Sequence, residues 1–142
     1  MLAVVDTNVV VAGLLTSDRA SPTARLLDRM LTGDLRFVLS LDLLAEYRLV
    51  LLRPAIATAH GLAAEEVDIL LQRLAQSAIL REPTAAPESC PDPGDEHLWA
   101  LLAGAPGAVL VTGDRRLNVN PPGFARVTTP AAFLEQLEHG DG

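Results

Sequence analysis

Leu2-Ala3-Val4-Val5-Asp6-Thr7-Asn8-Val9 is the stretch that decides the fold of this chain. A run of apolar residues is typical of a buried strand, and this one ends on an acid followed by two small polar residues. In open α/β sheets, ligands bind at the carboxyl ends of the strands. We therefore expect Asp6 to lie at the carboxyl edge of a central strand and to face a crevice.

The same layout recurs late in the chain. The apolar residues Val109-Leu110-Val111 lead into Thr112-Gly113-Asp114. Two apolar strands that each end in an aspartate predict one shared acidic site.

Between these two strands, strand-like and helix-like segments alternate, which predicts a parallel sheet with crossover helices. Ser21 and Ser40 are expected to cap helices, and Pro54 is expected to end the second of them. Residues 83–94 are rich in proline and acids and are expected to form a loop. The predicted strands cover about 2–6, 37–39, 109–112 and 124–127, and the predicted helices cover about 22–32, 41–53, 63–80, 95–103 and the segment from 130. Residues 78–80 are an alternative start of a further strand.

Composition limits the class of protein. A chain of 142 residues is expected to form one domain, 1–142, with an aliphatic core, since 49% of its residues are hydrophobic. The net charge of −7 argues against a broad basic surface for nucleic acid. It does not exclude nucleic acid, because bound divalent metal cancels the field of clustered carboxylates.

A single cysteine, Cys90, fits a reducing compartment and is expected to be a small loop residue rather than a nucleophile. Residues 1–5 lack the basic start of a signal peptide, and no apolar run approaches the ~18 residues of a membrane span. A cytoplasmic protein with no membrane association is therefore expected.

Four acids lie at the edges of predicted elements. Asp6 and Asp114 end strands, Asp95 lies at the start of a helix, and Glu46 lies on the helix at 41–53. At ~100° per residue, Glu46 projects about 40° outside the apolar stripe of its helix. A carboxylate at that rim can reach across a crevice between helix and sheet.

A group of carboxylates indicates a cation. Mg²⁺ and Mn²⁺ prefer oxygen ligands, and they activate water and stabilise the charge that builds on a phosphoryl group. Without metal, the acids repel one another and some retain a proton.

Each acid also has a structural explanation. Asp6 is compatible with a solvated strand end, and Asp114 with a turn. Glu46 is compatible with an exposed helix acid, and Asp42 on the same helix competes with it as the candidate site acid. Asp95 fits a helix N-terminus that Asp92 caps and where proline occupies the first position. The four acids together, in this order, favour a site.

Other catalytic motifs are missing from the sequence. The three histidines do not have the spacing of metal ligands. His97 follows Asp95 and Glu96 and is expected to be a solvated helix residue. The sequence contains neither a Walker motif nor GxGxxG, and no serine lies in a GxSxG context.

The chain resembles PIN-domain nucleases, and among them the VapC-like toxins of bacterial toxin–antitoxin systems. Each matching motif is short, but the motifs follow the family's order and span nearly the whole chain. They are Val5-Asp6-Thr7-Asn8-Val9, Leu44-Ala45-Glu46-Tyr47 with Leu52-Arg53-Pro54, Asp92-Pro93-Gly94-Asp95-Glu96-His97-Leu98, and Val111-Thr112-Gly113-Asp114.

This resemblance implies a three-layer α/β/α sandwich around a central parallel sheet and Mg²⁺- or Mn²⁺-dependent cleavage of RNA. It implies that the catalytic and metal-binding acids are Asp6, Glu46, Asp95 and Asp114, and that Asn8 and Thr112 orient carboxylates or water. It also implies that the chain is a toxin component with a protein antitoxin as partner.

The sequence departs from the family at two positions. Gly94 and Arg116 stand where many relatives have an acid, so a fifth acidic ligand is in doubt. Two interpretations of Arg116 stay open, a contact with a substrate phosphate and a solvated turn.

Two rival functions also stay open. One is a catalytically silent PIN-like interaction module, against which the presence of all four acids argues. The other is a receiver-like phosphotransfer domain, which requires a lysine, and this chain has none.

A homodimer is expected from the high aliphatic content. The helices at 22–32 and 41–53 are the expected contact, because they carry more leucines than one small sheet face must absorb. These leucines are Leu26, Leu27, Leu31, Leu49 and Leu52. The alternative is that they cover the sheet or lie singly on the surface.

Overall fold

The computed structural model describes residues 1–139 and has a five-stranded parallel sheet at its centre. The strand order is β3-β2-β1-β4-β5, so β1 lies in the middle of the sheet. The strands are β1 (Leu2–Val5), β2 (Arg36–Leu39), β3 (Ile79–Leu80), β4 (Val109–Val111) and β5 (Arg126–Thr128).

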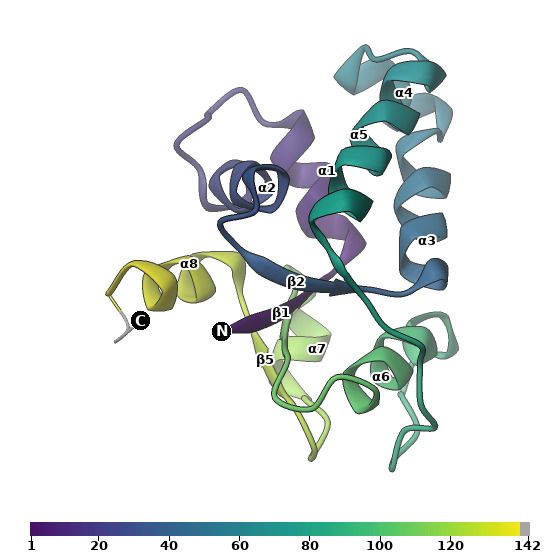
Figure 1. The fold of residues 1–142 in the computed structure, drawn as a ribbon, viewed down its shortest axis with the longest axis vertical. Helices are drawn as coiled ribbons and strands as arrows, with labels where there is room; N and C mark the ends of the chain where they lie inside the picture. The colour runs from purple at the N-terminus through teal and green to yellow at the C-terminus, as the bar shows by residue number, and fades with distance from the viewer. Residues whose placement is uncertain (140–142) are drawn as a thin grey trace.

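Helices cover both faces of this sheet, and α1, α2, α3 and α5 lie on one side while α6 and α7 lie on the other (Figure 1). The helices are α1 (Thr7–Leu15), α2 (Pro22–Thr32), α3 (Leu41–Leu51), α4 (Pro54–His60), α5 (Ala64–Ser77), α6 (Glu96–Ala103), α7 (Arg115–Val119) and α8 (Pro130–His139). A 3₁₀ turn, η1 (Pro93–Asp95), precedes α6. The predicted α/β/α sandwich with a parallel sheet is confirmed.

The register of the central strands brings the two acid motifs together. Val5 on β1 pairs with Val111 on β4, and the backbone N–H of Asp6 donates to the carbonyl of Val111 at 2.9 Å. All strands are parallel, so their carboxyl ends share one edge. The residues that follow β1 and β4 therefore meet at that edge, as the repeated layout predicts.

Capping residues set the helix boundaries as predicted. Ser21 caps α2 by accepting from Ala24, and Ser40 caps α3 by accepting from Leu43 at 3.0 Å. Gly33 ends α2 in the left-handed conformation, with φ of 84°, which glycine adopts without strain. The alternative strand at 78–80 is also present, as β3.

Three helices are missing from the sequence-based prediction. α1 begins directly after β1, and its residues Val9, Val10 and Val11 are all buried, so it has no polar face that would reveal a helical period. Pro54 follows the end of α3 as predicted, but it also starts α4, where proline is suited to the first position. α7 has only five residues, at a place where a turn was one of the alternatives.

The leucines of α2 belong to the core. Leu26 and Leu27 are buried in the hydrophobic core, and Leu31 and Leu52 are partly buried against the same core. Of the five leucines that predicted a dimer contact, only Leu49 is largely exposed, at 65%. The burial of Leu26 and Leu27 in the core leaves these two side chains out of the expected contact, and the homodimer itself stays a prediction.

No helix within residues 1–139 combines the length and the apolar character that crossing a lipid bilayer requires.

A close approach of α1 to α2 generates the first prediction. A Cβ atom added at Gly13 would lie 2.5 Å from the carbonyl oxygen of Thr23 and 3.1 Å from the Cβ of Leu27. We expect Gly13→Ala to lower the free energy of unfolding by about 1–3 kcal/mol, because the two helices must move apart. Urea denaturation measures this change.

Gly123→Ala is the matched control. A Cβ there comes within 3.3 Å only of a carboxylate oxygen of Glu88, which is the end of a flexible side chain. A Gly13→Ala variant as stable as Gly123→Ala would contradict the close packing of α1 on α2.

Candidate active site

All four predicted acids line one open pocket at the carboxyl edge of the sheet, together with Asp92. Each comes from a different segment of the chain. Asp6 follows β1, Glu46 lies on α3, Asp95 ends η1, and Asp114 follows β4 and precedes α7. The sheet and its crossover helices thus gather acids that are far apart in the sequence.

Asp6 is the most deeply buried of these acids, and it is only 6% exposed. It caps α1, with Oδ1 accepting from the backbone N–H of Thr7 at 2.8 Å. Its other oxygen, Oδ2, accepts from the hydroxyl of Thr112 at 2.7 Å and from the amide of Asn8 at 3.0 Å. Burial raises the pKa of Asp6 despite these hydrogen bonds.

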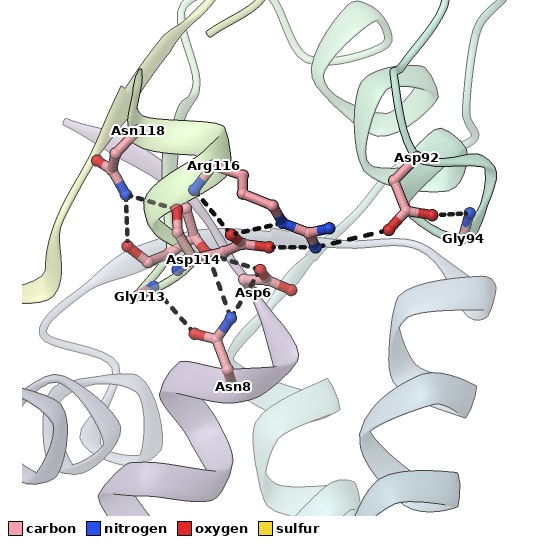
Figure 2. A network of polar contacts seen from close by, with 9 residues as sticks. Asp6, Asn8, Asp92, Gly94, Gly113, Asp114, Arg116 and Asn118 are labelled. Atoms are coloured by element: carbon pink, nitrogen blue, oxygen red, sulfur yellow. Dashed lines mark hydrogen bonds and ion pairs between the residues drawn. The ribbon is translucent and has the colours of Figure 1, made fainter. Parts of the chain in front are cut away.

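Asn8 and Thr112 connect Asp6 to the strand-end turn that carries Asp114. The Thr112 hydroxyl accepts from the backbone N–H of Asp114 at 3.0 Å while it donates to Asp6. Asn8 donates to Thr112 at 3.2 Å and accepts from the backbone N–H of Gly113 at 3.0 Å. These contacts, several of which are drawn in Figure 2, fix the two strand-end aspartates relative to each other.

Glu46 lies at the rim of α3, as its helical position predicts. Its Oε1 accepts from the hydroxyl of Thr7 at 2.5 Å, and its Oε2 lies 2.6 Å from Nε2 of His97. The neighbouring Tyr47 is fully buried and donates its hydroxyl to the carbonyl of Val5 at 2.5 Å. α3 is thereby attached to the end of β1, which places Glu46 near Asp6.

His97 was expected to be a solvated helix residue, and this was wrong. Its side chain is only 18% exposed and contacts Glu46 on a helix that is 51 residues away in sequence. Thr7 is a second contact of Glu46 that the sequence did not reveal. No local pattern marks either residue, because both contacts depend on how α1, α3 and α6 pack.

Asp95 lies close enough to the other pocket acids to feel their charges. Burial, and then the charges of Asp6 and three other pocket acids, raise the pKa of Asp95 to about 6. Asp92 caps η1 by accepting from the backbone N–H of Gly94 at 2.9 Å, and Pro93 follows it, as the capping alternative predicts.

Asp114 has the opposite environment because Arg116 holds its carboxylate. The Arg116 guanidinium donates through Nη2 to Oδ2 of Asp114 at 3.0 Å and through Nε to Oδ1 at 3.3 Å. The backbone N–H of Arg116 also donates to Oδ1, at 2.9 Å. The hydrogen bond from Arg116 is the main reason why the pKa of Asp114 is lowered.

The donor chemistry of this pocket fits a hard divalent cation. Five carboxylates line it against the two guanidinium groups of Arg53 and Arg116. Burial, and to a smaller extent the neighbouring acids, raise the pKa values of Asp6 and Asp95. Within residues 1–139, however, no three His, Cys, Asp or Glu side chains are arranged to hold a metal ion as they stand. Glu46 and Asp114 contact His97 and Arg116, and a carboxylate that binds a metal can keep such hydrogen bonds.

Comparison with known proteins identifies the family. Residues 3–116 match the family model described as PIN domain, and this matched range includes all four predicted acids. No match was found among curated proteins or among solved structures.

The raised pKa of Asp95 generates a prediction on stability and pH. The folded state binds a proton at Asp95 more tightly than the unfolded chain does. The contribution of Asp95 to the free energy of unfolding therefore falls as pH rises from ~4 toward 6. We expect Asp95→Asn to raise the metal-free melting temperature at pH 8, since it removes a carboxylate that burial and neighbouring charges disfavour. The gain should shrink as pH falls and disappear near pH 4.

Glu135→Gln, which neutralises an exposed acid on α8 outside this pocket, is the control. Melting curves of both variants and the native chain in chelator-treated buffers between pH 4 and 8 measure the effect. An Asp95→Asn variant that is no more stable than the native chain at pH 8 would contradict the electrostatics described for this pocket.

Proposed function

The chain belongs to the PIN-domain family of nucleases, and on this premise we propose that it is a metal-dependent ribonuclease. The observation that carries the proposal is the pocket itself, where five carboxylates meet at the carboxyl edge of the sheet and two of them have a raised pKa. Such a pocket attracts a divalent cation, and a phosphodiester is the substrate that such a cation can activate.

Asp6, Glu46, Asp95 and Asp114 would hold Mg²⁺ or Mn²⁺. When bound, the metal would supply a bound water with a lowered pKa and a positive charge for the phosphoryl oxygens. Hydrolysis would then form a bond between the water oxygen and phosphorus and break the bond to the leaving oxygen.

Other residues of the chain would prepare the site for this chemistry. Asn8 and Thr112 would keep Asp6 oriented through hydrogen bonds that exist before metal binds. Arg53 lines the pocket together with the acids, so it would provide a positive charge for a substrate phosphate. RNA binding would depend on these local charges, since the chain as a whole carries a net charge of −7.

We further propose that the protein is a cytoplasmic toxin component that a protein antitoxin inhibits. The resemblance of the ordered motifs to VapC-like toxins supports this role. The competing proposal is a catalytically silent PIN-like module, and the presence of all four acids in one pocket argues against it.

Cleavage assays test the proposed activity. Asp6→Asn and Asp114→Asn should each lower the rate of Mn²⁺-dependent RNA cleavage on the order of 10³-fold, because the metal contributes several kcal/mol to transition-state stabilisation. Both variants should keep the circular dichroism spectrum of the native chain. Single-stranded DNA of the same sequence, assayed in parallel, tests the specificity for RNA.

Asp42→Asn is the matched control, since Asp42 is an exposed acid on α3 that lies outside the pocket. It should cleave at the native rate. RNA cleavage that survives in Asp6→Asn, or that needs no divalent cation, would overturn the proposed mechanism. A native chain that cleaves no RNA at all would favour the silent module.

The expected homodimer stays a proposal, and α3 is now its best contact. Leu41 and Leu49 on this helix are 79% and 65% exposed, and exposed apolar side chains that gather on one face are typical of an interface. Light scattering at micromolar concentration should give a dimer mass for the native chain. Leu49→Glu should convert it to a monomer, while Val119→Glu on α7, at the same 65% exposure, should not. A monomeric native chain would refute the dimer.

A further inference from the structure

Arg116 occupies one side of the acidic pocket. Its guanidinium donates to both carboxylate oxygens of Asp114, and its Nη2 also lies 3.6 Å from Oδ2 of Asp92. Figure 2 shows the side chain extending from the start of α7 toward the loop that carries Asp92. A single cation of this chain therefore joins two acids from segments that are 22 residues apart in sequence.

The opposite side of the pocket, around Asp6 and Asp95, has no such cation. Within residues 1–139, no arginine forms an ion pair with either carboxylate. Arg116 therefore forms ion pairs on one side of the pocket, and no arginine within residues 1–139 does so on the other.

We propose that Arg116 takes the place of one divalent cation, so that this pocket binds a single Mg²⁺ or Mn²⁺ on the side of Asp6 and Asp95. This inference rests on the proposed metal-dependent function. A second divalent ion at Asp114 and Asp92 would have to displace the guanidinium or lie within a few ångströms of it, where like charges repel strongly. Nuclease sites that use two ions place them ~3.5–4 Å apart.

The role concerns metal binding rather than stability. The Arg116 side chain is 74% exposed, and an ion pair with that exposure contributes little to folding. The guanidinium cannot lose its proton, so at every working pH it opposes a second divalent ion between Asp114 and Asp92. Replacing Arg116 should therefore change how many divalent ions bind while the fold is preserved.

Isothermal titration of the full chain with Mn²⁺ tests the inference. The native chain should bind one Mn²⁺, and Arg116→Asp should bind two, because it removes the competing cation and adds an acid beside Asp114. Loss of the free Mn²⁺ signal in electron paramagnetic resonance gives an independent count. Circular dichroism checks that each variant is folded.

Arg115→Asp is the matched control, because it makes the same charge change at the neighbouring position of α7, outside the pocket. It should still bind one Mn²⁺. Two ions on the native chain, an unchanged single ion on Arg116→Asp, or a second ion on Arg115→Asp would overturn the role of Arg116 and leave the metal-dependent function intact. No Mn²⁺ bound by any of these proteins would overturn both.

Discussion

The hydrogen bond from Thr112 to Asp6 is the interaction on which the candidate site depends. It joins residues 106 positions apart at the ends of two paired parallel strands, β1 and β4. The same hydroxyl accepts from the backbone N–H of Asp114, so a single side chain sets the positions of both strand-end aspartates. Because β1 is the central strand, the elements that bring the other acids are arranged around this point.

The fold keeps several carboxylates close together by giving most of them an internal partner. Asp6, Asp92 and Asp114 each accept from a backbone N–H at the start of the helix or turn that follows. These N–H groups have no partner within their own helix and favour negative charge. Burial, and then the charges of the neighbouring acids, raise the pKa of Asp95 to about 6. The pocket is therefore stable as an acidic site and still able to attract a cation.

The sequence predicts the sheet, four of the five strands, the alternative strand at 78–80 and the four pocket acids. These predictions succeed because apolar runs and caps such as Ser21 and Ser40 are local signals. α1 is not predicted, because it is buried on several sides and its sequence therefore lacks the alternation of apolar and polar faces that marks a surface helix. Two contacts are also not predicted, that of His97 with Glu46 and that of Arg116 with Asp92. Both depend on tertiary packing that no local pattern encodes.

Anomalous diffraction from crystals of the native protein grown with Mn²⁺ can show whether the acids around Asp6 form a cation site at the carboxyl edge of the sheet. We expect one anomalous peak in this pocket, within coordination distance of carboxylate oxygens of Asp6 and Asp95, with Arg116 still bonded to Asp114. A pocket without a peak at millimolar Mn²⁺, in crystals where the metal is ordered elsewhere, would contradict this expectation.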